Sequence, residues 1–205
     1  MKKKIRILAA GDLHGDIAQA EKLAQRSEDE NIDIVILTGD ITHFGGPAEG
    51  LIGPFAKRNK KVFLIPGNHE NVETINLLAD LYGVKNLHGY YAIVGDIALF
   101  GCGGATKVGP ILRLYEEEVK YLLGRSHKEI KDFKRKIMIT HEHPAGSIID
   151  KIIPNSGSQS IREAVDQFKP DFVLCGHIHE AAGIEEKIGS TTLINVGKSG
   201  KIIEL

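Results

Sequence analysis

Short apolar runs alternate with longer amphipathic stretches through the first half of the chain. Ile5–Ala10, Ile34–Thr38 and Val62–Ile65 are almost continuously apolar, as expected of strands that are buried on both faces of a sheet. Between and after these runs, the spacing of apolar residues predicts helices at Ile17–Asp29, Pro47–Arg58 and Glu70–Leu81. This alternation of strand, loop and helix predicts a layered α/β fold.

The second half of the chain is richer in strand-like segments. Tyr91–Val94 and Ile97–Gly101 flank Gly95 and Asp96, which predicts a hairpin with a tight turn. Further strands are predicted at Lys136–Thr140, Phe172–Cys175, Gly183–Ile188, Thr191–Val196 and Lys201–Glu204. Helices are predicted at Leu114–Leu123 and at Gln159–Phe168, which ends before Pro170.

Length and composition are those of an ordinary globular domain. The chain has 205 residues without an internal repeat or linker, so residues 1–205 are predicted to form a single domain. No apolar run approaches the roughly 20 residues that cross a bilayer. The basic start Lys2–Lys4 leads into an apolar stretch too short for a signal peptide, so we expect a cytoplasmic protein without a membrane partner.

Charge and cysteine content count against nucleic-acid binding and against a disulfide-stabilised protein. The formal net charge of −1 gives no overall field that favours nucleic acid. Cys102 and Cys175 are too few for a disulfide framework, and Cys175 lies in an apolar run typical of a buried strand. A small molecule is therefore a more favoured partner than nucleic acid.

Polar clusters follow five of the predicted strands at the point where each strand ends. The clusters are Gly11-Asp12-Leu13-His14, Gly39-Asp40, Gly67-Asn68-His69, Thr140-His141 and Gly176-His177-Ile178-His179. One Gly-Asp pair alone would be an ordinary turn or helix cap. Open α/β sheets bind ligands beyond the carboxyl ends of their strands, so if these strands share a sheet layer the clusters converge on one rim.

The residue types in these clusters are those that bind divalent metal ions. Imidazole and carboxylate ligands suit Mn²⁺, Fe²⁺ or Zn²⁺, and the lack of cysteine excludes a cysteine-rich structural zinc site. Residues i and i+2 of an extended segment point to the same side, so Asp12 and His14 should bind together, as should His177 and His179. Asp40 is the carboxylate expected to bridge two ions that clamp a phosphate ester.

Glycine precedes the polar residues in most of these clusters. Gly11, Gly39, Gly67 and Gly176 stand directly before an Asp, Asn or His. We expect these glycines to permit unusual φ values and a close approach of the backbone to a bound anion.

In this order, the motifs resemble those of the calcineurin-like metallophosphoesterase superfamily. The resemblance is carried by Asp12-x-His14, Gly39-Asp40, Gly67-Asn68-His69-Glu70, His141 and Gly176-His177-x-His179, which run through nearly the whole chain. It implies a four-layer α/β/β/α sandwich of two mixed sheets flanked by helices. It also implies that the metals lie at the rim between the two central sheets.

The resemblance further implies a role for each residue. One ion would be held by Asp12, His14 and His179, the second by Asn68, His141 and His177, and Asp40 would bridge them. His69 would assist the leaving group as a general acid or transition-state stabiliser, while a metal-bridging hydroxide attacks phosphorus. Mn²⁺ is the favoured metal, with Fe, Zn or Ni as alternatives.

One position departs from the protein-phosphatase branch of this superfamily. That branch carries Gly-Asp-x-x-Asp, often followed by Arg-Gly, and the second Asp orients the catalytic histidine. Here His43 stands in place of the second Asp and no Arg follows. This favours a small phosphodiesterase over a phosphoprotein phosphatase. His43 is a candidate substrate contact, with a plain loop residue as the equal alternative.

We therefore predict a metal-dependent hydrolase of phosphodiesters, with monoesters as further candidate substrates and a small nucleotide or other phosphate ester as the partner. Two alternatives stay open, a scaffold protein on the same fold and a partner-dependent nuclease. A scaffold protein should have lost some of the ligand residues, but every ligand position holds a competent residue. A nuclease should carry a basic stripe that leads to the metals. A homo-oligomer also stays open, because the apolar stretch Ile184–Leu205 offers an edge for pairing.

Overall fold

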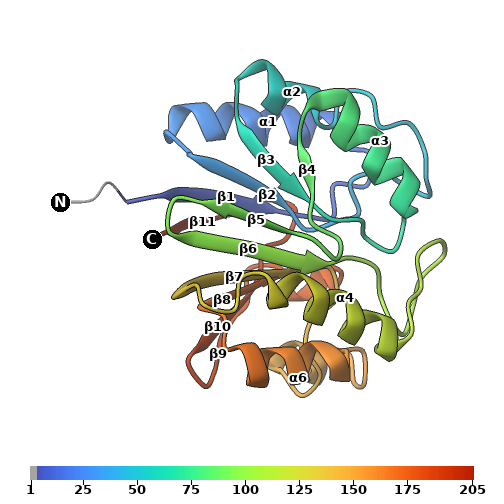
Figure 1. Ribbon diagram of the computed structural model, residues 1–205. Helices are drawn as coiled ribbons and strands as arrows, with labels where there is room; N and C mark the ends of the chain where they lie inside the picture. The colour runs from blue at the N-terminus through green and yellow to red at the C-terminus, as the bar shows by residue number, and fades with distance from the viewer. Residues whose placement is uncertain (1–3) are drawn as a thin grey trace.

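Residues 4–205, the part of the chain described by the computed structural model, form two β-sheets that pack face to face (Figure 1). The first sheet has the strand order β11-β1-β2-β3-β4. Its strands are β1 (Arg6–Ala10), β2 (Ile34–Leu37), β3 (Lys61–Leu64), β4 (Lys85–Asn86) and β11 (Lys201–Glu204). Strands β1 to β4 are parallel, and β11 runs antiparallel to β1 at the edge.

The second sheet has the strand order β5-β6-β7-β8-β10-β9. Its strands are β5 (Tyr91–Val94), β6 (Ile97–Cys102), β7 (Arg135–Thr140), β8 (Phe172–Cys175), β9 (Glu185–Ile188) and β10 (Thr191–Asn195). Its inner strands are parallel, whereas β5 and β9 form antiparallel edges. The predicted hairpin is β5 and β6, and the C-terminal stretch expected to offer an edge supplies the outer strands β9 and β11.

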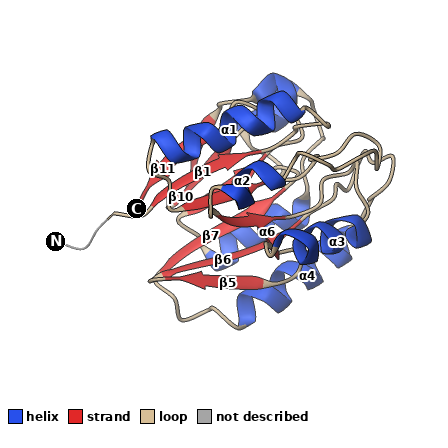
Figure 2. Ribbon diagram, turned by 90° about the horizontal axis from the view of Figure 1, so that it is seen from above, coloured by secondary structure: helices blue, strands red, loops and turns tan. Residues whose placement is uncertain are grey.

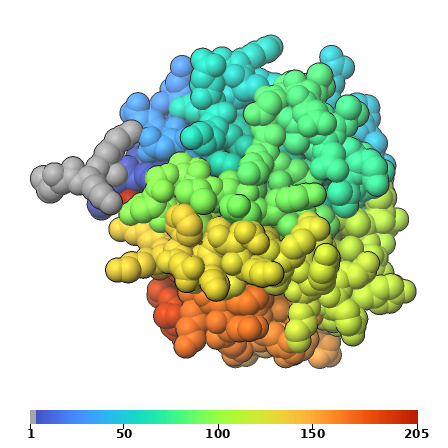
Figure 3. Space-filling model, in the orientation of Figure 1, coloured from blue at the N-terminus to red at the C-terminus, as the bar shows by residue number. Residues whose placement is uncertain are grey.

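Helices cover the outer faces of both sheets, which gives the predicted four-layer α/β/β/α sandwich (Figure 2). The helices are α1 (Ile17–Asp29), α2 (Gly53–Lys57), α3 (Val72–Tyr82), α4 (Glu116–Lys128), α5 (Ile148–Ile152) and α6 (Gln159–Phe168). The first three lie over the first sheet, and α4 and α6 lie over the second (Figure 1). The space-filling view shows the N-terminal half, blue to green, packed directly on the yellow-to-red C-terminal half (Figure 3).

Side-chain alternation along the strands assigns residues to layers. In β1, Ile7 belongs to the core between the two sheets, whereas Leu8 belongs to the core under the helices. The inner core continues with Ile36 from β2 and Ile139 from β7, all fully buried. Both faces of these strands are covered, which explains why the runs are almost continuously apolar.

Capping residues explain why α1 and α6 have the predicted bounds. Asp16 precedes α1, and its carboxylate accepts a hydrogen bond from the backbone N–H of Gln19. Ser158 precedes α6 and its hydroxyl oxygen accepts from the N–H of Ile161. Each cap satisfies an amide that the first helical turn leaves without a partner.

Three predicted helices have different bounds in the structure, and the one predicted at Leu114–Leu123 runs over Glu116–Lys128. The segment Pro47–Arg58 is helical only at Gly53–Lys57, because Gly50 adopts a left-handed φ of 77° that ends any earlier helical turn. The helix predicted at Glu70–Leu81 begins at Val72, because Asn71 caps it. The short elements β4, α5 and the 3₁₀ turn at His179–Ala181 were not expected from the sequence.

The polar clusters come from both sheets rather than from one. Three follow β1, β2 and β3 of the first sheet, and two follow β7 and β8 of the second. The condition of a shared sheet layer is therefore not met, but the clusters still converge, at the rim between the two sheets. Hydrogen bonds join them across the sheets, since His177 N–H donates to Asp12 Oδ1 at 3.0 Å and His141 Nδ1 lies 2.8 Å from the Thr38 carbonyl oxygen.

No helix among residues 4–205 is both long enough and apolar enough to cross a membrane. The single domain over residues 1–205 stays a prediction, and residues 1–3 lie outside the described part of the chain.

Candidate metal centre

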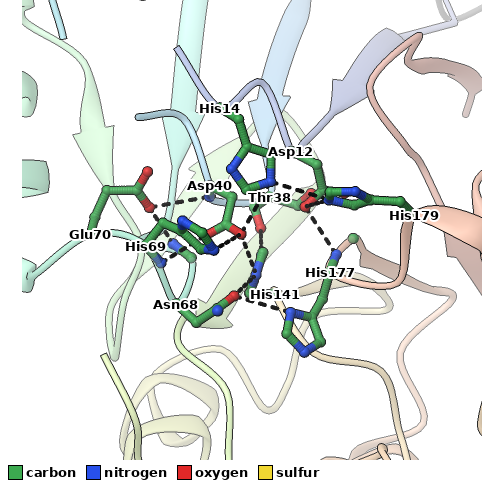
Figure 4. Close-up of polar contacts among 12 residues, drawn as sticks. Asp12, His14, Thr38, Asp40, Asn68, His69, Glu70, His141, His177 and His179 are labelled. Atoms are coloured by element: carbon green, nitrogen blue, oxygen red, sulfur yellow. Dashed lines mark hydrogen bonds and ion pairs between the residues drawn. The ribbon is translucent and has the colours of Figure 1, made fainter. Parts of the chain in front are cut away.

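All eight predicted metal-ligand and catalytic residues meet at the rim where the loops of the two sheets come together. Figure 4 shows their side chains pointing toward one another around Asp40. The predicted metal ligands fall into two groups, and His69 lies beside both.

The first group consists of Asp12, His14 and His179. One candidate ligand atom from each lies within 4.8 Å of the other two. His14 Nε2 and His179 Nε2 face each other at 3.1 Å. Asp12 is buried, and its Oδ2 has no hydrogen-bond partner among residues 4–205. A buried carboxylate oxygen without a donor is costly, and a divalent cation would satisfy it.

The second group consists of Asp40, His141 and His177, whose candidate ligand atoms also lie within 4.8 Å of one another. Asn68 completes this group. Its Oδ1 lies 2.8 Å from His141 Nε2 and 3.0 Å from His177 Nδ1. Carboxylate, amide and imidazole atoms thus converge without a thiolate, which is a donor set suited to Mn²⁺, Fe²⁺ or Zn²⁺.

Asp40 lies between the two groups. Its Oδ2 is 3.6 Å from His14 Nε2 in the first group and 3.4 Å from His141 Nε2 in the second. Its Oδ1 accepts a hydrogen bond of 2.9 Å from the backbone N–H of His69. Asp40 Oδ2 therefore faces ring nitrogens of both groups.

His69 and His43 lie on one side of this arrangement. The His69 ring centroid is 4.7 Å from that of His14, and His69 Nε2 is 3.9 Å from Asp40 Oδ2. His43 is exposed, and its ring stacks on His69 with a centroid distance of 5.6 Å. Candidate ligand atoms of His14, His43 and His69 also lie within 4.8 Å of one another, although this group contains no carboxylate.

A cavity of about 210 Å³ opens on the side of the site opposite His69 and His43. It is lined by Asp12, His14, His179, Ala182, Gly197 and Lys198. The Lys198 ammonium is held by Asp16 at 2.7 Å. The first ligand group therefore faces solvent through a small hollow that carries a fixed cation.

Comparison with known proteins decides the family. The model of the calcineurin-like phosphoesterase family matches residues 5–181. The chain belongs to the calcineurin-like phosphoesterase family. The resemblance found in the motifs is thereby confirmed, as is the predicted fold class.

Relatives of this phosphoesterase chain are distant. It is 29% identical over 204 residues to the uncharacterized protein MJ1162 of Methanocaldococcus jannaschii, covering 95% of this chain and 89% of the relative. It is 25% identical over 172 residues to a probable cyclic nucleotide phosphodiesterase of Vesicomyosocius okutanii, covering 79% of this chain and 69% of the relative.

Solved structures share the fold at still lower identity. TT1561 of Thermus thermophilus has a TM-score of 0.80 and 18% identity, covering 96% of this chain and 91% of the other. A structure described as a novel archaeal phosphodiesterase has a TM-score of 0.55 and 17% identity, covering 98% of this chain and 100% of the other.

The backbone of the site loops corrects one expectation about the paired ligands. The prediction that Asp12 and His14 share an extended segment is wrong, because both have left-handed φ values, 56° and 48°. The backbone is also left-handed at Asp40 and His177, with φ values of 49° and 70°. Each such residue costs on the order of 1 kcal/mol. The pairs reach one site because the chain turns sharply at the ligands themselves.

The glycines before the ligands serve mainly for close packing. Gly39 has a φ of 99°, but the expectation of unusual φ is wrong for Gly11, Gly67 and Gly176. A Cβ on Gly39 would lie 2.8 Å from His141 Nδ1, and one on Gly176 would lie 2.8 Å from Asp12 Oδ2. What approaches these glycines is thus another part of the site, and not only a bound anion.

Glu70 is a functional residue whose role was not predicted from the sequence. It is fully buried and accepts hydrogen bonds from the backbone N–H groups of Thr42 at 2.6 Å, Gly67 at 2.7 Å and Asp40 at 3.1 Å. It thereby joins the loop after β2 to the loop after β3. Burial, together with the Asp40 charge, raises the pKa of Glu70 despite these hydrogen bonds.

Protonation states in the site follow from burial and from Asp40. Burial lowers the pKa of His14 to about 4 and that of His177 to about 3, so both are neutral, as metal ligands must be. Burial alone would lower the pKa of His141 too, but Asp40 and Asp12 raise it to about 9. Burial would raise the pKa of Asp40, but His141 and the His69 N–H outweigh it and hold the pKa well below its usual range.

Substitution of Glu70 should loosen the site. Glu70→Ala leaves three buried N–H donors without an acceptor, at a cost of ~1–3 kcal/mol each. We expect a lower thermal unfolding temperature and weaker Mn²⁺ binding by calorimetry. Glu73→Ala, an exposed neighbour on α3, is the control. Unchanged Mn²⁺ affinity in Glu70→Ala would show that Glu70 does not hold the ligand loops.

Metal binding should release a proton from His141. With a pKa of about 9, the metal-free protein carries this proton at neutral pH, whereas a ligand imidazole is neutral. His14 and His177 are already neutral and should contribute no proton. Mn²⁺ affinity should therefore rise by about tenfold per pH unit between about pH 6 and about pH 9, measured by calorimetry. Affinity that stays constant over this range would contradict the assignment of His141.

Proposed function

We propose that this chain hydrolyses small phosphodiesters with two divalent ions held at the two ligand groups. The observation that carries the proposal is Asp40, whose Oδ2 lies within reach of both groups. The family and two relatives named as phosphodiesterases, one of them only probable, support the same class of reaction. We retain Mn²⁺ as the favoured metal and the cytoplasm as the expected location.

In this proposal each ligand group holds one ion. Asp12, His14 and His179 hold the first, Asn68, His141 and His177 hold the second, and Asp40 is shared. Ions bound there would supply Lewis acidity toward phosphoryl oxygens and lower the pKa of water. The protein itself keeps the ligands in place, since His141 Nδ1 lies 2.8 Å from the Thr38 carbonyl oxygen, which leaves Nε2 facing the site.

His69 is the proposed catalytic group that does not bind metal. It lies beside Asp40 and the first ligand group, with its backbone N–H bound to Asp40 Oδ1. Burial lowers the pKa of the His69 imidazole, so the ring is neutral near pH 7 and presents one N–H donor. Such a donor stabilises negative charge that develops on a leaving-group oxygen. His43, stacked on His69, is the proposed substrate contact on this side.

The dimensions of the site support a small substrate. The cavity beside the first ligand group has a volume of about 210 Å³, below the roughly 300–1,000 Å³ of typical small-molecule pockets, so it accommodates only part of a substrate. Lys198 lines this cavity and offers a cation to the anionic phosphodiester or to a further anionic group of the substrate. The small size of the cavity favours a small phosphate ester whose remainder lies outside the cavity.

A substrate panel tests the proposal. With Mn²⁺ added, the protein should hydrolyse an activated phosphodiester and a cyclic nucleotide faster than an activated monoester or single-stranded DNA. Asp40→Asn is the control, because loss of the shared carboxylate should remove both metal and turnover. Metal content is measured in parallel by elemental analysis.

Each result of the panel has a defined meaning. Turnover of the monoester alone would overturn the assignment as a diesterase. Cleavage of single-stranded DNA alone would indicate the nuclease, and no turnover above the metal-free control would indicate a scaffold. An Asp40→Asn protein that retains two metals would contradict the sharing of Asp40.

His69→Ala should separate catalysis from metal binding. Because His69 is not a proposed ligand, the variant should retain its metals. Its kcat should fall by about 100-fold or more for a phosphodiester with a poor leaving group, and much less for a nitrophenyl diester that needs little help. Steady-state kinetics and elemental analysis measure the two effects. Equal losses with both substrates would mean that His69 does not act on the leaving group.

A further inference from the structure

An exposed aromatic side chain stands directly beside the proposed catalytic histidine. Phe44 is 57% exposed, whereas the described phenylalanines of the cores are mostly buried. Its φ of 49° is left-handed, a conformation that bulky residues rarely adopt. An apolar ring held in a strained and solvent-facing position does not serve the core. Such outliers cluster at functional sites.

The loop that carries Phe44 is fixed to His69. Gly45 N–H donates a hydrogen bond of 2.9 Å to the His69 carbonyl oxygen, and Gly46 N–H donates one of 2.9 Å to that of His43. The Phe44 ring centroid lies 4.5 Å from the His69 ring and 4.5 Å from the His43 ring. Phe44 is therefore placed at a defined position beside the group that faces the leaving oxygen.

A second loop brings another exposed apolar side chain to the same place. Ile111 is 41% exposed, and its N–H donates to the Asn68 carbonyl oxygen at 3.2 Å. A Cβ added to Gly45 would lie 3.5 Å from Ile111 Cδ1, so the two loops touch. This second loop is anchored by buried Glu142, which accepts a hydrogen bond from Thr106 N–H at 3.0 Å.

We propose that Phe44 and Ile111 form a subsite for a planar aromatic moiety on the leaving group of the phosphodiester, such as a nucleobase. The inference rests on the proposed function, because it takes His69 as the marker of the leaving-group side. Phe44 supplies a ring face for stacking, and Ile111 supplies an apolar wall beside it. Stacking tolerates any planar ring, so the subsite selects for planarity rather than for one base.

Paired substrates isolate the subsite from general reactivity. Methyl phenyl phosphate and methyl hexafluoroisopropyl phosphate have leaving groups of similar acidity, but only phenol is planar. Adenosine 3′,5′-cyclic phosphate and the same cyclic phosphate on an abasic ribose form the nucleobase pair. For each substrate, kcat/KM of Phe44→Ala is divided by that of the unaltered protein, which cancels intrinsic reactivity.

Phe44→Ala should lose about tenfold in kcat/KM for the aromatic member of a pair and less than about twofold for the other member. Phe44→Trp should restore the preference. A selective loss for the aromatic member in the phenyl pair alone, or in the nucleotide pair alone, supports the subsite. It also shows whether the ring that the subsite binds is a phenyl group or a nucleobase. Equal losses with all four substrates would mean that Phe44 only supports His69, and no loss would mean that it contacts no substrate; either result overturns the proposal.

Further variants exclude a folding artefact. Phe44→Gly also removes the ring, but glycine suits the left-handed φ, so it should show the same loss of preference without a lower unfolding temperature. Leu77→Ala removes another exposed apolar side chain, from α3, and should leave kcat/KM unchanged. A preserved aromatic preference in Phe44→Gly would overturn the proposal.

A binding measurement keeps this inference separate from the proposed function. Phenyl phosphate and methyl phosphate are titrated into the Mn²⁺-loaded protein by calorimetry. Phe44→Ala should weaken the binding of phenyl phosphate by about tenfold and leave the affinity for methyl phosphate unchanged. This result would support the subsite even in a protein that turns over no diester. Equal affinity of the two phosphates in the unaltered protein would overturn the subsite, whatever the activity.

Discussion

Asp40 is a buried carboxylate surrounded by imidazoles that arrive from both sheets, and the rest of the site is arranged around its charge. Its Oδ2 lies 3.4 Å from His141 Nε2 and 3.6 Å from His14 Nε2. Such a charge is costly in the interior unless a proton or a cation compensates it. His141 carries the compensating proton in the metal-free protein, and its raised pKa expresses the same attraction that would hold an ion. Fold and metal chemistry are therefore coupled through one carboxylate.

Holding that carboxylate requires loops that sheet packing alone would not favour. Asp40 and the proposed ligands His14 and His177 have left-handed backbones, and Gly39 lies so close to His141 that a side chain would not fit. The strain is balanced by contacts that cross from loop to loop, above all through Glu70. Rigid strands on both sides make these contacts possible, because their ends cannot move apart.

The sequence was sufficient to predict which residues meet at one site but not the path of the chain between them. Apolar runs on parallel strands predict where each strand ends, and the ligand types follow directly after. The sequence places Glu70 in a helix, because nothing local shows that it accepts hydrogen bonds from the loop after β2 as well as from Gly67 in its own loop. The sequence also does not predict the left-handed turns at Asp12 and His14. The rule that residues i and i+2 point to the same side applies only to an extended backbone. The same limit applies to Phe44, whose importance depends on contact with His69.

The two sides of Asp40 have different chemistry, which bears on specificity. His179 is exposed and lines the cavity that contains Lys198, whereas His69 lies across Asp40 from it (Figure 4). On the proposed function, the anionic part of a diester would face the polar side and its leaving group would face His69. The residues on that second side, Phe44 and Ile111, are not required to hold metal. Substrate choice can therefore change there by loop substitution while the metal centre stays intact.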